Sequence, residues 1–435
     1  MFKNLKQHNL VTSFFVFLCA FPTLRYIVVG KDSITLFDYL FSALPDIACI
    51  VVIFIIPFNY FSKYKALNLK KIDYYFLAYL IFTTIYGCFL SRDLKACFLG
   101  FKLSVIPMLF YFVGRYLDVK KTDFNELYLK PVFYLFSIIG IIGFILYFFV
   151  PGFNMEIIEN ISGVINQYLI VRMTSIFWTP VVFGSAMGFT LLYLNHQYLT
   201  TDKFSKLQML FLVFTWFGLI LSVSRGPIIC FVLAQIGMFF IQRNRKKIIY
   251  ISVALTLLYV LSILLASLQQ QMLYNGGNFL SLFYNMINFT VKSAAETATL
   301  EGGLTRVELW RRSWIDFMHQ PWGYGLGKSG HIAWRLFKDT SVPSSPYSTD
   351  GWYLKLLGET GIPGALFFIS IIYFFVVEIK KAKLLINQET TVVVLIFLFV
   401  LLQNVVSNVF DYYCIAPLFY LLLGHITNYF NSEKS

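Results

Sequence analysis

Charged residues are scarce in this chain: Asp, Glu, Lys and Arg together make up 13% of its 435 residues. Apolar residues reach 58%, and the mean hydropathy of +0.69 lies outside the range of soluble domains of this length. This composition excludes a soluble globular protein and predicts a protein that crosses a membrane many times. The net charge of +13 does not indicate a nucleic-acid partner, because the basic residues are not gathered into one patch.

Cysteines are also few, six in the whole chain, and all of them fall within or at the edges of apolar runs. Their spacing matches no metal site and predicts no disulfide framework in an outer loop. We therefore expect them to pack as small apolar side chains. The six are Cys19, Cys49, Cys88, Cys97, Cys230 and Cys414.

About twelve apolar runs approach the roughly 20 helical residues that cross a bilayer. They lie at 10–29, 37–60, 72–91, 97–117, 131–150, 180–198, 207–224, 227–242, 247–267, 362–379, 391–410 and 413–430. The sequence therefore predicts an all-α polytopic membrane protein with about twelve transmembrane helices. Because no internal repeat or linker divides the chain, we expect one integral membrane domain over residues 1–435.

Lysines and arginines gather in every second connection between these runs, as positively charged cytoplasmic loops do. The pattern predicts cytoplasmic termini and two extracytoplasmic loops, at 151–179 and 269–361. A retained first span is favoured over a cleaved signal peptide, since Arg25 stands where a cleavage site would be expected.

Ionisable residues inside apolar runs are costly to bury and often mark functional sites. In this sequence they are Arg25, Asp46, Lys102, Arg225 and Asp411. For Lys102, a functional role and a simple ion pair with Asp46 are equally weighted alternatives. Arg225 precedes Pro227, a residue suited to the first turn of a helix. The positive end of that helix would lie beside Arg225 and form an outward-facing anion site. The alternative is a tight turn whose arginine reaches lipid phosphate.

The long outer stretch contains a predicted amphipathic helix. Thr305 and Glu308 have the spacing of a capping box, so a helix should begin there and end before Pro321. Arg306 stands in its first turn, where the helix dipole disfavours a positive charge, and we interpret it as facing an anionic ligand.

The same helix has an apolar stripe and an internal ion pair. The stripe predicts packing on the membrane surface or against the bundle. Arg312 has acidic residues four positions away on both sides, so we expect it to be neutralised within its own helix. The stripe consists of Val307, Trp310, Trp314 and Phe317, and the acidic residues are Glu308 and Asp316.

Two further features follow in the outer stretch. The run from Trp322 to Gly327 alternates glycine with other residues and could cradle phosphate, but a plain turn is favoured because no strand precedes it and no helix follows it. Asp350 could accept a proton from an incoming hydroxyl. It could equally cap a helix that begins at Trp352.

Together these elements resemble the Wzy/O-antigen ligase superfamily of bacterial surface-polysaccharide assembly, over roughly residues 170–365. The order, topology and spacing of the elements carry the resemblance. They are Val171 to Pro180 with Arg172, Ser224-Arg225-Gly226, Arg306 with Trp310, Pro321 to Gly327, and Asp350 to Gly364.

The resemblance implies a glycosyltransferase of the GT-C-like fold in the bacterial inner membrane, which needs neither a metal ion nor a cofactor. Its partners would be undecaprenyl-pyrophosphate-linked oligosaccharides, a chain-length regulator and a flippase. Arg172, Arg225 and Arg306 would bind the pyrophosphate, with Arg306 also catalytic, because arginine can stabilise the leaving group without a metal. Asp350 would act as the catalytic base.

Asp350 and Gly351 stand where the ligase branch typically has histidine and asparagine, which favours a polymerase over a ligase. A lipid-linked oligosaccharide flippase or another transporter is the alternative without enzymatic activity, because many spans and buried charges also fit that class. Transporters usually contain repeats, and none is found in this sequence.

Overall fold

The computed structural model describes residues 7–29, 41–65, 69–117, 124–150, 172–177, 179–201, 204–241, 245–274, 306–330, 351–382 and 388–429. The regular secondary structure of these residues is entirely helical. They belong to two compact units: residues 1–14, 39–121 and 302–435 form unit 1, and residues 15–38 and 122–301 form unit 2. Helix α1 (Gln7–Val29) contributes residues to both units.

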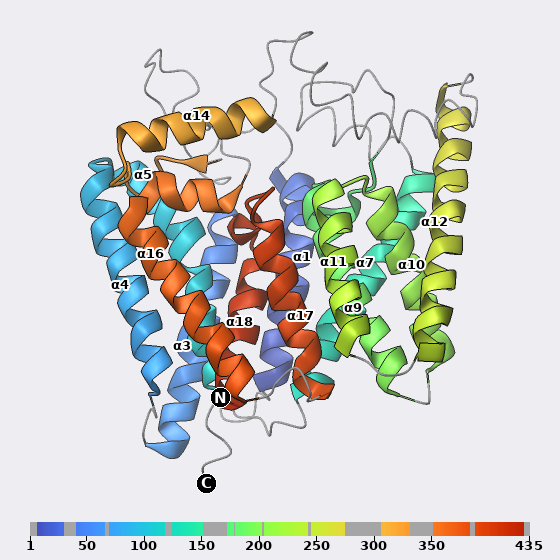
Figure 1. Ribbon diagram of the computed structural model, residues 1–435, viewed down its shortest axis with the longest axis horizontal. Coiled ribbons are helices and arrows are strands. Elements are labelled where there is room, and N and C mark those ends of the chain that lie inside the picture. The colour runs from blue at the N-terminus through green and yellow to red at the C-terminus, as the bar shows by residue number, and fades with distance from the viewer. Residues whose placement is uncertain are drawn as a thin grey trace. The chain divides into compact units, whose positions relative to one another are not determined.

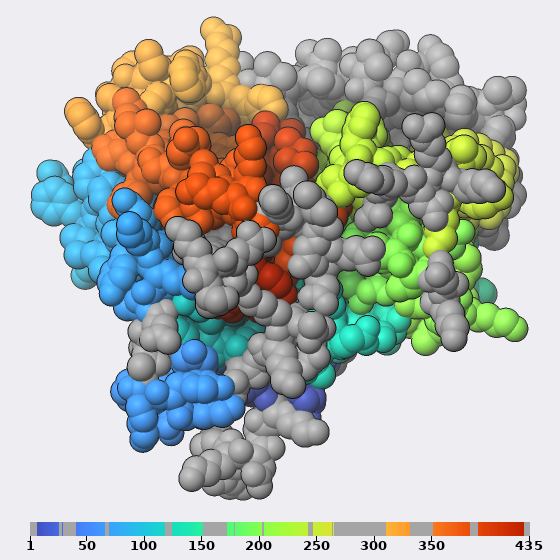
Figure 2. Space-filling view, turned by 60° about the horizontal axis from the view of Figure 1, so that its bottom comes forward, coloured from blue at the N-terminus to red at the C-terminus, as the bar shows by residue number. Residues whose placement is uncertain are grey.

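Unit 1 contains a bundle of long helices and one helix that lies across its end. Helices α4 and α16 run side by side, while α14 lies across the start of α16 (Figure 1). Figure 2 shows the side chains of α14 next to those of α16. The helices are α3 (Leu44–Tyr64), α4 (Lys71–Ser91), α5 (Leu94–Gly100), α6 (Phe110–Arg115), α14 (Arg306–His319), α16 (Trp352–Lys381), α17 (Gln388–Gln403) and α18 (Ala416–Ile426).

Short irregular helices interrupt the bundle of unit 1 at two places. Between α5 and α6 the chain forms a π-helical turn, η2 (Phe101–Val105), and a 3-10 turn, η3 (Pro107–Leu109). Between α17 and α18 lies the 3-10 turn η7 (Val409–Asp411), and η8 (Thr427–Tyr429) follows α18. π-helical turns occur frequently at functional sites, and η2 contains two polar side chains, Lys102 and Ser104.

Unit 2 is built from α7 (Lys130–Phe149), α9 (Pro180–Thr200), α10 (Lys206–Leu221), α11 (Arg225–Ile241) and α12 (Arg245–Tyr274). The π-turn η5 (Asn125–Leu129) precedes α7, and the 3-10 turn η6 (Ser175–Phe177) precedes α9. Helix α9 is buried along nearly its whole length, and α7 and α10 pack against it.

All twelve predicted apolar runs contain a helix. Among the described residues, five helical stretches are long and apolar enough to cross a membrane, and several shorter apolar helices accompany them. The chain is therefore a multi-pass membrane protein. The five are Leu44–Tyr64, Lys71–Ser91, Leu94–Arg115, Asn125–Phe149 and Trp352–Lys381.

The start of α16 differs from the predicted boundary of its apolar run. The helix begins at Trp352, ten residues before the run at 362–379. Gly361, with φ 64° and ψ −161°, interrupts the helical geometry between the two parts. Residues 352–360 are thus helical and largely buried, and do not form an exposed loop.

Candidate functional site

Arg172 lies against the turn that joins α10 to α11 in unit 2. Its Nε donates to the carbonyl of Ser222 at 3.2 Å, and one terminal nitrogen donates to Ser224 Oγ at 2.9 Å and to the Val223 carbonyl at 3.5 Å. Val223 has φ 50°, an unfavourable backbone conformation for a β-branched residue. These bonds therefore hold a strained turn, and they also satisfy carbonyl groups at the end of α10.

Arg225 is the first residue of α11 and follows Ser224 directly. The helix begins two residues before Pro227, so Arg225 stands within its first turn and not ahead of it. The structure thus brings two predicted site residues to one turn: Arg172 donates to the residue that precedes Arg225. Two cations at a helix N-terminus create a positive potential that suits an anionic group.

The other two predicted site residues are less fully described. Arg306 is the first residue of α14 in unit 1, as the sequence predicted for that helix, and its side chain is outside the described set. Asp350 lies outside the described residues. The helix α16 begins at Trp352, as the capping alternative for Asp350 assumed, and the residue at its N-cap position is Gly351.

The predictions for α14 hold in part. The helix ends at His319, before Pro321. Burial raises the pKa of Asp316 above its ordinary value, and the positive charges of His319 and Arg312 oppose the rise, as expected if Arg312 acts within its own helix. The apolar stripe does not face one environment, because Phe317 is buried whereas Trp314 is 51% exposed.

The glycine-rich segment after α14 forms a plain turn, as favoured from the sequence. Its backbone amides from residue 323 to residue 328 donate to protein acceptors, so they are not left to bind phosphate. Gly325 (φ 100°) and Gly327 (φ 75°) touch the backbone of Ser91 and Ala96 so closely that a Cβ atom would collide with it. These two glycines therefore seat the segment on the corner between α4 and α5.

The α4–α5 corner contains a disulfide between Cys88 and Cys97, whose Cα atoms are 5.3 Å apart. The expectation that all six cysteines pack as isolated apolar residues is wrong for this pair, because the reversal at residues 91–93 brings the end of α4 beside the start of α5. For the other four, which are buried and take part in no disulfide among the described residues, the expectation is confirmed.

Asp93 ties this corner to the glycine-rich segment. It caps α5 by accepting from the backbone N–H groups of Lys95 and Ala96, and it accepts from Lys328 Nζ at 3.1 Å. The Ala96 N–H is the main cause that holds the pKa of Asp93 below its ordinary value; burial opposes it, and Lys328 and the Lys95 N–H add to the lowering.

A cluster of buried ionisable groups lies at the start of α16, and Asp411 is the one charged member of it that the sequence indicates. Lys355 Nζ is 2.5 Å from Asp411 Oδ1, 3.0 Å from Ser104 Oγ and 4.0 Å from Glu359 Oε1. Glu359 Oε1 also accepts from the N–H of Gly327 at 3.0 Å. The available signal was the spacing of Lys355 and Glu359, which places an opposite-charge pair four residues apart on one helical face.

Lys102 forms an ion pair with Asp46 at 2.6 Å, which bears out the simpler of its two interpretations. The hydroxyl of Tyr413 donates to the other oxygen of Asp46, also at 2.6 Å. Lys102 and Ser104 both belong to the π-turn η2, and Asp411 and Tyr413 are two residues apart. The Lys102–Asp46 and Lys355–Asp411 ion pairs are therefore linked through the same two segments.

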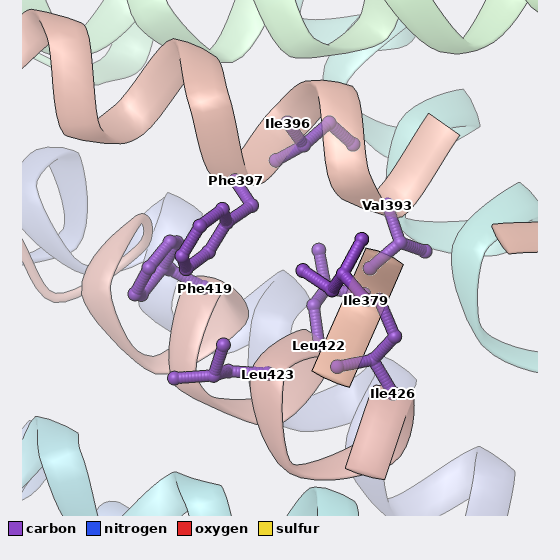
Figure 3. Close-up of a pocket in the computed structure, with 8 residues that line it drawn as sticks. All are labelled: Ile379, Val393, Ile396, Phe397, Phe419, Leu422, Leu423 and Ile426. Carbon is purple, nitrogen blue, oxygen red and sulfur yellow. The ribbon is translucent and has the colours of Figure 1, made fainter. Parts of the chain in front are cut away.

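Two further searches among the described residues concern pockets and metal ligands. A pocket among α16, α17 and α18 is lined only by apolar side chains, so it presents no group for a charged substrate (Figure 3). Its lining residue Ile379 lies near the end of α16 opposite to Lys355. Among the described residues, no group of three histidine, cysteine or acidic side chains is placed to hold a metal ion.

Part of the chain matches a known protein family. Residues 210–369 match the family model described as O-Antigen ligase, Wzy_C. The matched range contains Arg225, Arg306, the glycine-rich segment and the start of α16, whereas Arg172 and Asp411 lie outside it. No curated protein matches the sequence. Over residues 210–369, the chain is therefore similar to the O-antigen ligase family of Wzy-type proteins that act in polysaccharide assembly.

Proposed function

We propose that this protein is a polysaccharide polymerase that transfers a growing glycan from undecaprenyl pyrophosphate to a lipid-linked repeat unit at the extracytoplasmic face. The observation that carries the assignment is the paired arginine turn of unit 2, where Arg172 bonds to Ser224 and Arg225 begins α11. Similarity to the O-antigen ligase family supports lipid-linked glycans as the substrates.

The arginines suit the chemistry of the leaving group. The acceptor hydroxyl oxygen attacks the anomeric carbon of the donor, the bond from that carbon to the pyrophosphate oxygen breaks, and the pyrophosphate leaves with the electron pair. Arg172 and Arg225, with Arg306 as a third clamp, stabilise the developing negative charge through charge-assisted hydrogen bonds. Asp350 accepts the proton of the attacking hydroxyl. This reaction requires neither a metal ion nor a cofactor.

The proposed architecture is one GT-C-like integral membrane domain of about twelve transmembrane helices in the bacterial inner membrane. Both termini would be cytoplasmic, and 151–179 and 269–361 would be outer loops. The Cys88–Cys97 disulfide supports this orientation, because disulfides persist in oxidising compartments. The glycine-rich segment bonds to the same corner through Leu326 and Lys328, so it belongs on the same side of the membrane.

The position of Gly351 supports a polymerase over a ligase. Gly351 has φ 144°, and a Cβ atom there would lie 2.7 Å from the Val405 carbonyl oxygen. Its N–H donates to Asn408 Oδ1 at 3.1 Å. The asparagine typical of the ligase branch therefore does not fit at this position. The packing around Gly351 in this chain thus requires the departure from the ligase pattern.

Purified protein supplied only with undecaprenyl-pyrophosphate-linked repeat units tests the assignment. A polymerase produces a ladder of longer lipid-linked chains, and the ladder persists in a chelator. In a parallel reaction that also contains a different, non-undecaprenyl acceptor, transfer of glycan only to that acceptor would identify the ligase alternative, which the family description favours. Movement of the substrates across vesicle membranes without any new glycosidic bond would identify a flippase and overturn the proposed function.

A further inference from the structure

Lys355, Glu359 and Asp411 lie buried together in unit 1, and the proposed reaction uses none of them. The side chains of Lys355, Glu359 and Asp411 are only 1%, 5% and 4% exposed. One cation and two carboxylates give the cluster a formal charge of −1. Burying such groups in a membrane protein is costly, and charges inside membrane segments commonly mark functional positions.

The cluster joins four segments that are distant in the sequence. Ser104, in the π-turn η2, accepts from Lys355 and donates to Glu359 Oε2 at 3.4 Å. Glu359 accepts from the N–H of Gly327 in the glycine-rich segment. Asp411, in η7, accepts from Lys355. Because Lys355 contacts all three other side chains, it is the central member of the cluster.

The same region holds the residues next to Asp350. The N–H of Gly351 donates to Asn408 Oδ1 at 3.1 Å, and the N–H of Trp352 donates to the Asn404 carbonyl at 2.8 Å. Asn408 precedes η7, the turn that contains Asp411. The ion pair between Lys355 and Asp411 therefore fixes the start of α16 against the segment that also anchors Gly351.

We propose that Lys355 is a positioning residue for glycosyl transfer: through Asp411, Glu359 and Ser104 it sets the place of the α16 start and of the glycine-rich segment. This role rests on the proposed function and adds a determinant that lies outside the arginine clamps. Lys355 itself need not touch the substrate. Its removal should slow the chemical step without weakening donor binding, since small displacements of reacting groups lower rates strongly.

The test compares Lys355→Met, Lys355→Arg and a matched control, Lys381→Met. Lys381 is on the same helix and pairs with Glu378 at 2.7 Å, but its side chain is 67% exposed. In the ladder assay, Lys355→Met should lower kcat on the order of 10–100-fold with a nearly unchanged KM for the donor. Lys355→Arg should recover part of the rate, and Lys381→Met should match the wild type.

Two further measurements separate positioning from stability. Hydrogen exchange of the amides in 321–330 and 351–360 should rise in Lys355→Met and not in Lys381→Met. The double variant Lys355→Met/Asp411→Asn leaves one buried carboxylate without a cation, whereas Lys355→Met leaves two. Its thermal stability should therefore be higher than that of Lys355→Met, while its kcat stays low. Recovery of kcat together with stability in the double variant would overturn the positioning role.

The outcomes also distinguish this role from the proposed function. If the wild type forms the ladder and a folded Lys355→Met variant keeps its kcat and its exchange pattern, the positioning role is wrong and the polymerase assignment stands. If the wild type forms no ladder, the polymerase assignment fails and the role in glycosyl transfer fails with it. If Lys355→Met does not insert, Lys355→Arg and the double variant decide the result by the same criteria.

Discussion

Lys355 on α16 and Asp411 in η7 are 56 residues apart in the chain, yet Lys355 Nζ lies 2.5 Å from Asp411 Oδ1. Among the described residues, the second oxygen of Asp411 is buried with no hydrogen-bond partner. The carboxylate therefore depends on Lys355 for most of its stabilisation. This dependence makes the pair sensitive to the removal of either partner.

Lys355→Met should destabilise the protein by roughly 3–5 kcal/mol, because it leaves two carboxylates in a buried site without a cation. Asp411→Asn should cost less, since Glu359 remains as a partner for Lys355 at 4.0 Å. Unfolding of the detergent-solubilised protein by heat or denaturant measures both losses of stability. If the losses in unfolding free energy from Lys355→Met and Asp411→Asn add up in the double variant, the two side chains are not directly coupled.

The sequence predicted those features that depend on local pattern. Apolar run length located the helices, and the capping-box spacing of Thr305 and Glu308 predicted the start of α14. The pairing of Lys102 with Asp46 was one of two alternatives that the cost of isolated charges suggested. The Cys88–Cys97 bond depends on the chain reversal between α4 and α5, and the Lys355 cluster depends on contacts between distant segments. Residues 352–361 fall within the stretch assigned to the outer loop, and contacts with distant residues such as Ser104, Phe410 and Asp411 bury them.

Arg172→Ala and Arg225→Ala should each lower the rate of ladder formation by roughly 10²–10³-fold, since each removes a cation that stabilises the leaving pyrophosphate. The matched control is Ser224→Ala, which removes the 2.9 Å bond to Arg172 but keeps both cations. It should reduce the rate far less. Equal rates in the wild type and both arginine variants, with normal membrane insertion, would rule out the clamp.

Asp350→Asn should lower kcat more than it weakens donor binding, because asparagine cannot accept the proton of the acceptor hydroxyl. Single-turnover rates and donor affinity, measured on the same preparation, separate the two effects. If Asp350→Asn polymerises at the wild-type rate, another group must take the proton.

Cys88 and Cys97 should react with a membrane-impermeant maleimide on intact spheroplasts only after reduction, because an outer, oxidised disulfide shields both thiols. A Lys381→Cys variant provides the opposite control: position 381 is exposed at the far end of α16 and should react only after the membrane is permeabilised. Labelling of Cys88 and Cys97 that requires permeabilisation would reverse the proposed orientation.

The lowered pKa of Asp93 predicts that the stability difference between the wild type and Asp93→Asn depends on pH. Its pKa is lowered in the folded protein, mainly by the Ala96 N–H, so the stability it contributes is present above its ordinary pKa and is lost as the pH falls through the folded value. Asp93→Asn keeps an oxygen that can cap α5 but removes the negative charge opposite Lys328. The wild type should therefore melt at a higher temperature than Asp93→Asn at neutral pH, and the gap should close below about pH 4.

Lys328→Met should narrow the same gap in melting temperature at neutral pH, because it removes one of the groups that lower the Asp93 pKa. A gap that is constant from neutral to acidic pH would show that the charge of Asp93 does not contribute to holding the glycine-rich segment on the α4–α5 corner.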